Sequence, residues 1–281
     1  MPFVLCSMHH ALCALTQTHQ ILKSFREVGK TDVNVIYIMW LRQLKKYFRS
    51  KSRIIGSLGQ PLLFLLAFGF GFGAIFKKAG AGNYMQFLAP GIILMSVLFT
   101  AIFSGIDLIW DRQFGFLKET MVAPVSRLQI MLGKTLGGAT VAAIQGVVVF
   151  VLTLLVGFRP HDLVLLPVGA VVVFLVAILF TSLGIALAST MEDMQGFQLI
   201  MNFLVMPIFF LSGALFPLEG LPKAMDIIAS LDPLTYGVDG LRFSFLGAQS
   251  VFGMTTDLTV LVVLTGLLLT IGSRLFERIQ A

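Results

Sequence analysis

Six long apolar runs, separated by short polar stretches, form the main pattern of this chain. Each run is long enough to cross the hydrocarbon core of a bilayer, which takes about 20 residues of α-helix at a rise of about 1.5 Å per residue. We therefore predict an all-α membrane protein with six transmembrane helices. The predicted spans cover residues 54–76, 87–110, 130–157, 163–190, 197–216 and 258–276.

Small residues recur every four positions in the third run, at Gly138, Ala142 and Gly146. This spacing lets helix backbones approach closely in lipid. Packing within the chain is the default expectation for such a seam, and a subunit interface is the alternative.

A shorter amphipathic stretch, residues 35–53, precedes the first run. At about 100° per residue, its aromatic and leucine side chains fall on one side and its basic side chains on the other. The pattern predicts an interfacial helix whose basic side faces lipid headgroups and water. It leaves open whether the helix is only an anchor or also contacts a cytosolic partner. The apolar side carries Tyr37, Trp40, Leu41, Leu44, Tyr47 and Phe48, and the basic side carries Arg42, Lys45, Lys46, Arg49 and Arg53.

The stretch between the fifth and sixth runs, residues 217–257, is too apolar for a solvated loop. Pro222 can open a short helix that stops before Pro233, and a second amphipathic helix covers about residues 235–246. Irregular backbone at membrane depth persists only where protein or a water-filled cavity covers it. We therefore expect short re-entrant helices that dip into the outer leaflet.

Composition and charge agree with a membrane protein and orient it. Of 281 residues, 57% are hydrophobic and 12% charged, and the mean hydropathy is +0.92. The net charge of +6 is spread beside the spans and forms no long basic tract, which favours membrane orientation over nucleic-acid binding. Both termini and the loop 111–127 are predicted to face the cytoplasm. The richer side holds Arg42, Lys45, Lys46, Arg49, Lys51, Arg53, Arg112, Lys118, Arg127, Lys134, Arg274 and Arg278, and the poorer side Lys77, Lys78, Arg159, Lys223 and Arg242.

The first 30 residues differ from the rest, so we divide the chain into a poorly ordered leader, 1–30, and a transmembrane domain, 31–281. The leader lacks the basic start and the unbroken apolar core of a signal peptide. Its Cys6, His9, His10 and Cys13 are residue types that zinc sites use, but no fold pattern follows them, and we expect no metal site. With no further cysteine, a disulfide framework is excluded.

Three kinds of chemistry lack their required residues. Gly133, Lys134 and Thr135 resemble the end of a phosphate-binding loop, but Leu128 stands where the motif needs its first glycine. Ser212 has no histidine partner evident in the spans, so no catalytic residue is predicted. The span interiors offer only Gln145, Asn202 and hydroxyl groups as polar side chains, which argues against an ion-coupled relay.

The chain resembles a permease subunit of the ABC-2 type, similar to bacterial and archaeal drug-resistance and polysaccharide or lipid exporters. The resemblance covers roughly Val35 to Ala281. It rests on WLRQLKKYFRSKSR, LAPGII, DRQFGFLKETMVAPVSR followed by GK, MEDMQGFQ, LSGALFPLEGLP and LDPLTYGVDGLR.

The resemblance implies a six-helix half-transporter without enzymatic activity of its own, paired as a homodimer or heterodimer with a second six-helix permease. Two separate ATPase subunits would bind the pair and hold the ATP and Mg²⁺, so this chain needs no cofactor. The resemblance further implies an amphipathic substrate and export across the cell (cytoplasmic) membrane. A gradient-driven carrier or channel without an ATPase is the alternative, and a membrane-anchored assembly protein is a third hypothesis.

The resemblance also assigns roles to residues. The loop after the second span would contact the ATPase, a short turn before the fifth span would make a second cytosolic contact, and the external helices would form a gate. Phenylalanines in the spans would line the substrate path. The loop residues are Asp111, Arg112, Phe114, Gly115, Phe116, Leu117, Lys118, Glu119, Pro124, Ser126 and Arg127; the turn residues Glu192 and Asp193; the gate residues Pro217, Pro222, Pro233, Tyr236 and Arg242; the path residues Phe64, Phe68, Phe99, Phe103, Phe209 and Phe210.

Overall fold

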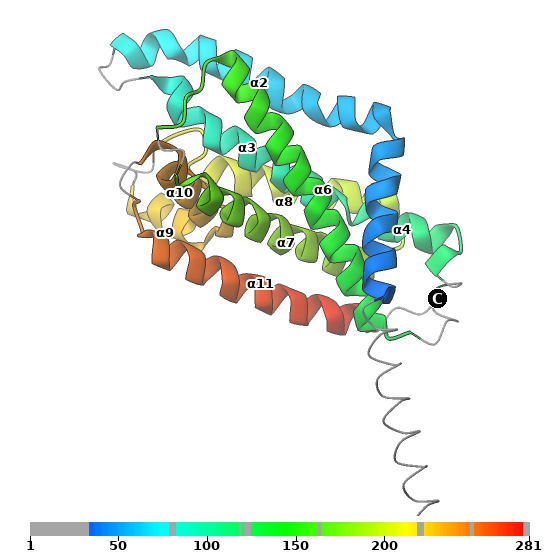
Figure 1. The fold of residues 1–281 in the computed structure, drawn as a ribbon. Helices are drawn as coiled ribbons and strands as arrows, with labels where there is room; N and C mark the ends of the chain where they lie inside the picture. Colours follow the sequence, from blue (N-terminus) through cyan, green and yellow to red (C-terminus); the bar gives the residue numbers. More distant parts are fainter. Residues whose placement is uncertain are drawn as a thin grey trace, which may run out of the picture.

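The computed structural model describes residues 34–78, 83–117, 120, 125–161, 164–217, 222–247 and 250–277, and all regular structure in these ranges is helical. The predicted leader lies outside the described residues. A first helix covers residues 34–49 and turns at Ser50 into α2. The remaining helices are α2 (Lys51–Lys78), α3 (Tyr84–Phe103), α4 (Ile106–Gln113), α6 (Arg127–Val156), α7 (Leu166–Thr190), α8 (Met194–Leu211), α9 (Lys223–Leu231), α10 (Pro233–Leu246) and α11 (Met254–Glu277), as Figure 1 shows.

Six helical segments of the described chain are long and apolar enough to cross a membrane, which confirms the predicted all-α membrane fold. Their ends lie within about five residues of the predicted ones. The second span is interrupted, because α3 ends at Phe103 and α4 begins at Ile106. The fifth span ends at Leu211 instead of Phe216, because the chain turns at Gly213 with φ +72°.

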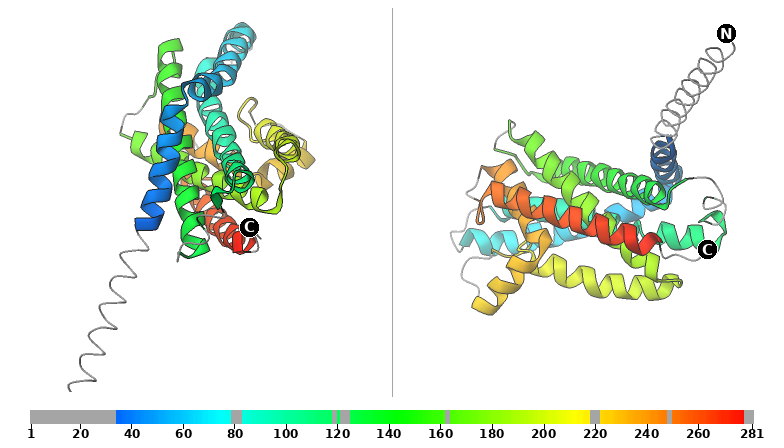
Figure 2. Two further views of the ribbon diagram at one scale, coloured as in Figure 1. Left: turned by 90° about the vertical axis from the view of Figure 1, so that its right-hand side faces the viewer. Right: turned by 90° about the horizontal axis from the view of Figure 1, so that it is seen from below.

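The helices α3 and α7 form the centre of the bundle. In the most apolar stretch of the span that begins with α3, 72% of residues are buried, and in that of α7, 61% are buried. The corresponding share is 17% in both α2 and α11, so these two helices lie at the periphery. The two central helices approach closely where Gly105 lies against Gly184. In α6, Gly138 faces Ser104 and Thr181, and Gly146 faces Val97 and Val173, so this glycine seam packs within the chain. Figure 2 shows the same arrangement from two further directions.

Helix 34–49 runs across one end of the bundle, and α2 leaves it in a different direction (Figure 1). The last turn of α11 lies at the same end, and the short helices α9 and α10 lie at the opposite end. Pro222 precedes α9, and Pro233 is the first residue of α10, where a proline costs no hydrogen bond. The two short helices predicted between the fifth and sixth spans are thus present. Their place on the external side and their insertion into the outer leaflet stay predictions.

The helix α10 packs into the bundle through one face. Leu234, Val238, Leu241 and Phe245 are buried at helical spacing against α7, α3 and α11. The Asp232 side chain caps the first turn by accepting from the Leu234 N–H at 2.9 Å. Burial raises the pKa of Asp232 to about 7. The helix α10 is therefore anchored on the bundle at the end opposite helix 34–49.

Candidate functional site

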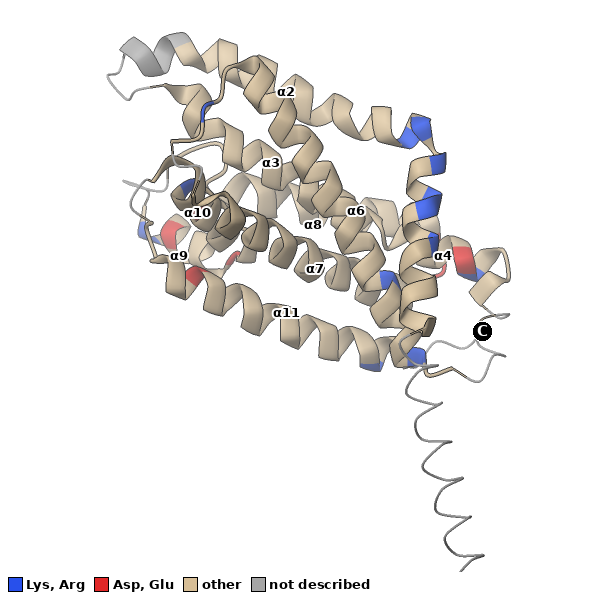
Figure 3. Cartoon of the chain, viewed as in Figure 1, with Lys and Arg blue, Asp and Glu red and all other residues tan. Residues whose placement is uncertain are grey.

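Lys and Arg residues gather along the helix 34–49 and beside α4 and the start of α6, as Figure 3 shows. Two carboxylates, Asp107 and Asp111, lie one turn apart on α4 in the middle of this basic end. Residues four positions apart share one face of a helix, so both acids point in the same direction. The opposing helix 34–49 presents Arg42 and Lys46, also four residues apart. Two pairs of charges therefore face each other across the two helices.

Asp111 is the more buried of the two acids, with 4% of its surface exposed. Arg42 donates to both of its oxygens, from Nη1 to Oδ2 at 2.9 Å and from Nη2 to Oδ1 at 2.7 Å. The Nζ of Lys134, on α6, donates to Oδ2 of the same carboxylate and is 2% exposed. A bidentate arginine pair has a fixed geometry, so this carboxylate joins helix 34–49, α4 and α6 in one defined arrangement.

Asp107 makes a looser set of pairs. Lys46 Nζ lies 2.8 Å from its Oδ1, and Arg53 Nη1, from the first turn of α2, lies 3.4 Å from both of its oxygens. Together the two carboxylates face four basic side chains from three elements. We call Arg42, Lys46, Arg53, Asp107, Asp111 and Lys134 the charge network.

Neutral contacts hold helix 34–49 on α6 beside the charge network. Tyr47 donates its hydroxyl to Gln145 Oε1 at 2.7 Å, and Trp40 donates Nε1–H to Thr140 Oγ1 at 3.0 Å. Burial raises the pKa of the Tyr47 phenol, so it keeps the proton that it donates. At Gly133 an added Cβ would overlap Met39, so glycine permits this close approach.

Two residues of the predicted basic side of helix 34–49, Arg42 and Lys46, pair with the acids of α4 and keep 30% and 38% of their side chains exposed. Tyr37 and Phe48, on the predicted apolar side, are 55% and 58% exposed, and the buried line consists of Met39, Gln43 and Tyr47. The orientation of this helix at a membrane stays a prediction. The pairing with α4 was not predicted, because periodicity separates polar from apolar side chains but carries no information about acids on another segment.

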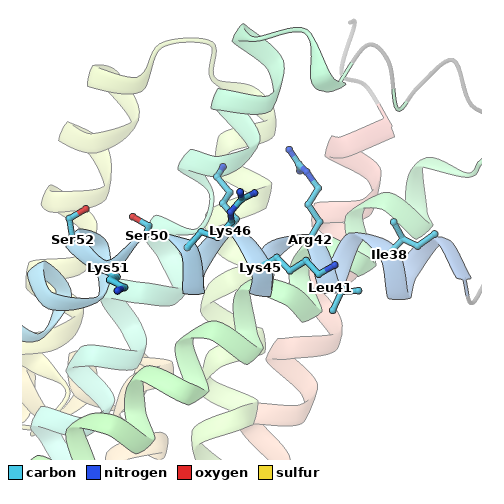
Figure 4. Close-up of a pocket in the computed structure, with 9 residues that line it drawn as sticks. Ile38, Leu41, Arg42, Lys45, Lys46, Ser50, Lys51 and Ser52 are labelled. Atoms are coloured by element: carbon cyan, nitrogen blue, oxygen red, sulfur yellow. The ribbon is translucent and has the colours of Figure 1, made fainter.

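The other basic residues of this helix do reach the surface. Lys45 and Arg49 are exposed, as predicted. They line an open hollow of about 930 Å³ at the corner between helix 34–49 and α2, shown in Figure 4 with Arg42 and Lys46 on its wall. Its lining residues are Ile38, Leu41, Arg42, Lys45, Lys46, Arg49, Ser50, Lys51 and Ser52.

The loop after α4 turns at Gly115, whose φ of +77° is a left-handed conformation that favours glycine. Phe114 is 72% exposed and stacks on Trp110 with ring centroids 5.0 Å apart. Phe116, in contrast, lies under the Arg42 guanidinium at 3.6 Å, and Leu117 is buried. Among the described residues of this region, the exposed aromatic pair is therefore an apolar surface that is open to a partner.

Some loop residues predicted to contact a partner therefore lie elsewhere. Asp111 and Leu117 are buried, and Phe116 is partly buried beneath Arg42. The predicted contacts Lys118, Glu119 and Pro124 lie outside the described residues. Ser126 starts α6 with a capping box to Gln129, and Arg127 is the first residue of that helix.

The loop and the turn before α8 lie side by side. Arg112 Nη2 lies 2.8 Å from Glu192 Oε1, and Gln113 Nε2 donates to the Glu192 carbonyl at 3.1 Å. Asp193 caps α8 by accepting from the Gly196 N–H at 2.7 Å. The two predicted cytosolic contacts therefore form one continuous surface.

At the opposite end, two of the predicted gate residues make interactions within the chain. Arg242 donates to the Gly213 carbonyl at 2.7 Å and lies 3.7 Å over the Phe87 ring. Burial lowers its pKa to about 10, so it stays charged at neutral pH. Tyr236 donates its hydroxyl to the Ser230 carbonyl at 2.7 Å. Pro217, Pro222 and Pro233 flank the turns and helices here.

The phenylalanines predicted to line a path fall into two groups. Phe64 lies between Phe68 and Phe209, with centroids 5.3 and 6.1 Å away, whereas Phe99 stacks on Phe103 at 6.1 Å. Phe209 is 1% exposed and so faces no open path within this chain. Its neighbour on α8, Phe210, is 43% exposed.

The meeting of Arg42, Lys46, Asp111 and Lys134 was not predicted from the sequence, in which they belong to separate segments. The repeated spacing of four residues on two segments, Arg42–Lys46 and Asp107–Asp111, was the available signal. In the described ranges, no group of three or more His, Cys, Asp or Glu side chains gathers into a metal-binding cluster. Cys6, His9, His10 and Cys13 lie outside these ranges.

Comparisons with known proteins agree on one family. A family model described as ABC-2 type transporter matches residues 34–246. Nodulation protein J of Rhizobium leguminosarum bv. trifolii is 31% identical over 215 residues, which are 75% of this chain and 78% of that protein. A protein of Cyanophora paradoxa named transport permease ycf38 is 30% identical over 79% of this chain and 80% of its own length. The inner membrane transport permease YadH of Escherichia coli (strain K12) is 28% identical over 80% of this chain and 88% of its own length. The residues that the family model matches, 34–246, include all six residues of the charge network.

Proposed function

The chain belongs to the ABC-2 type transporter family, and on that premise we propose that it is the membrane subunit of an ATP-driven exporter. Two separate ATPase subunits would bind its basic end and hold ATP and Mg²⁺. A second six-helix permease, identical or related, would complete the transport path. The basic end would face the cytoplasm, in keeping with the positive-inside rule, and the cargo would be an amphipathic molecule.

The observation that carries this proposal is the exposed Phe114–Trp110 pair at the end of an ion-paired helix. An exposed aromatic side chain is a typical anchor in a protein interface. The helix that bears it, α4, is tied by Asp107 and Asp111 to helix 34–49, α2 and α6. A push on the loop would therefore move several elements together, and the paired permeases would switch between inward and outward access.

The adjoining surface fits a partner of mixed charge. Arg112 and the Glu192 side chain, which is 81% exposed, lie beside the aromatic pair, and opposite charges at the rim of an interface orient the partner. The relatives named transport permease support a membrane transport role for the family. Export, the ATPase partners and the dimer are our inference for this chain.

Replacing Phe114 tests the proposal. The ATPase should be a soluble chain with G-x-x-x-x-G-K-[ST], such as one encoded beside this gene, co-expressed and co-purified with the full permease. We expect Phe114→Ala to lower capture of the ATPase by roughly tenfold, the effect of losing an interface anchor of about 1.4 kcal/mol. Folding should not change, because this side chain is largely exposed.

Phe203→Ala is the matched control, since this phenylalanine is 83% exposed on α8, away from the loop. It should retain normal capture of the ATPase. Normal capture by Phe114→Ala, or ATP hydrolysis by the permease alone, contradicts the proposal. Transport that persists in ATP-depleted vesicles would favour a gradient-driven carrier instead.

A further inference from the structure

A cavity of about 190 Å³ lies between the first half of α2 and the second half of α3. The two helices are in close contact at their other ends, where an added Cβ at Gly69 would overlap Met85 and Phe72 lies 6.1 Å from Tyr84. They leave space between them toward helix 34–49. The cavity is lined by Tyr47, Arg53, Gly56, Ser57, Gln60, Pro61, Met95, Ser96, Phe99, Thr100 and Phe103.

The lining has an apolar part and a polar part. Phe99 and Phe103 are stacked one turn apart on α3, with an interplanar angle of 16°. The side chains of Gln60, on α2, and Thr100, which follows Phe99 on α3, make no hydrogen bond with any other described residue. Half-buried polar groups that line a cavity without partners are available to a ligand. The lining therefore suits a molecule that has both an apolar and a polar part.

The charge at the mouth of the cavity is positive. Arg53 shares the Asp107 carboxylate with Lys46, and Lys46 is closer, at 2.8 Å against 3.4 Å. One carboxylate therefore faces two cations. The Arg53 side chain is 41% exposed, so most of its N–H donors remain open to a second anion. Lys51 and Arg49 in the adjoining hollow add to the positive charge.

We propose that this cavity binds an amphipath with an acidic headgroup, with the headgroup at Arg53 and the apolar part along Phe99 and Phe103. Gln60 and Thr100 would supply further hydrogen bonds. This inference rests on the proposed function, because it identifies the cargo class and places its uptake at the basic end of the bundle. Phe64, Phe68 and Phe209 play no part in it.

The test uses the full chain in nanodiscs of phosphatidylcholine, without any ATPase. The probe is dodecyl phosphate with a photoreactive diazirine on its tail, and mass spectrometry quantifies labelling of the peptide that contains Phe99 and Phe103. We expect saturable labelling by the phosphate probe and weak, unsaturable labelling by the matching alcohol and trimethylammonium probes. Equal labelling by all three probes overturns the proposal.

Inorganic phosphate serves as a competitor that separates the headgroup from the whole amphipath. Unlabelled dodecyl phosphate should abolish labelling, and inorganic phosphate at the same concentration should not, because it lacks contacts with Phe99 and Phe103. Equal competition by both would mean a simple anion site and would overturn the proposed amphipath.

Substituting Arg53 tests the headgroup contact. Arg53→Gln should weaken labelling by the phosphate probe by about tenfold, the effect of losing one charge-assisted hydrogen bond. Lys51→Gln removes the same charge from the same end of α2 but lies outside the cavity lining, and it should change labelling by less than about twofold. Equal losses in both variants would indicate a general surface potential and overturn the site.

Filling the cavity gives a second, independent test that leaves Arg53 in place. Both Gly56 and Gly59 have open space where a Cβ would lie, but only Gly56 lines the cavity. Gly56→Leu should abolish labelling at Phe99 and Phe103, whereas Gly59→Leu should not. Equal labelling of the two variants overturns the proposal.

The outcomes separate this inference from the proposed function. The binding assay contains no ATPase, and the capture assay contains no amphipath. If the phosphate probe does not bind but the ATPase is captured normally, only the proposed site for an acidic amphipath is rejected. If the ATPase is not captured but the probe binds normally, the exporter assignment is rejected and the binding site in the cavity is retained.

Discussion

Asp111 is the residue on which three elements converge. Its carboxylate pairs with two cations, Arg42 and Lys134, and the Lys134 side chain on α6 is buried. Removing the acid would leave that ammonium buried without a carboxylate, whereas removing Lys134 would leave the bidentate pair with Arg42 intact. The two sides of one ion pair therefore differ in what they contribute to folding.

We predict that Asp111→Asn destabilises the protein by about 3–5 kcal/mol, because an uncompensated buried charge is left behind. The apparent melting temperature in detergent should fall by on the order of 10 °C. Lys134→Met should cost much less, and the double variant Asp111→Asn/Lys134→Met should recover most of the loss. If Lys134→Met is as damaging as Asp111→Asn, Arg42 is not a sufficient partner for the acid.

At the scale of helices, α7 crosses the chain closely at the junction between α3 and α4. Gly105 and Gly184 allow the backbones to touch there, and the chain leaves α3 and continues into α4 beside this crossing. The two acids of α4 face helix 34–49, where they pair with Arg42 and Lys46. This crossing was not predicted, because a glycine in a span fits lipid-facing and packed positions equally well.

We predict that Gly184→Leu prevents normal folding, because its Cβ would overlap the backbone carbonyl of Ile102 and no side-chain rotation relieves a backbone contact. Gly266→Leu on α11 is the matched control, since open space lies where its Cβ would be. Size-exclusion chromatography should give a single peak for Gly266→Leu and aggregated or lost protein for Gly184→Leu. A normal profile for both would mean that the close crossing is not required.

For the whole molecule, the distribution of charge predicts orientation. Lys45 and Lys223 are both exposed and lie at opposite ends of the bundle. With six spans, the described chain starts and ends on the same side of a membrane.

We predict opposite labelling of single cysteines placed at these two positions in a chain whose Cys6 and Cys13 are serine. Lys223→Cys should react with a membrane-impermeant maleimide in intact cells, and Lys45→Cys only after the membrane is opened. Expression levels of the two variants serve as the control. The reverse pattern would show that the basic end faces outward, against the positive-inside rule.

The sequence by itself determined the number of spans, their ends to within about five residues, and the two short helices between the fifth and sixth spans. Each depends on residues that are close in the chain: the length of an apolar run or a proline at a helix start. Tertiary structure alone decided the charge network. Arg42 and Asp111 are 69 positions apart, and Lys46 and Asp107 are 61 apart. Whether such side chains meet depends on how α3, α4 and α7 pack, because amphipathic periodicity describes one segment and not the neighbour that its polar side will face.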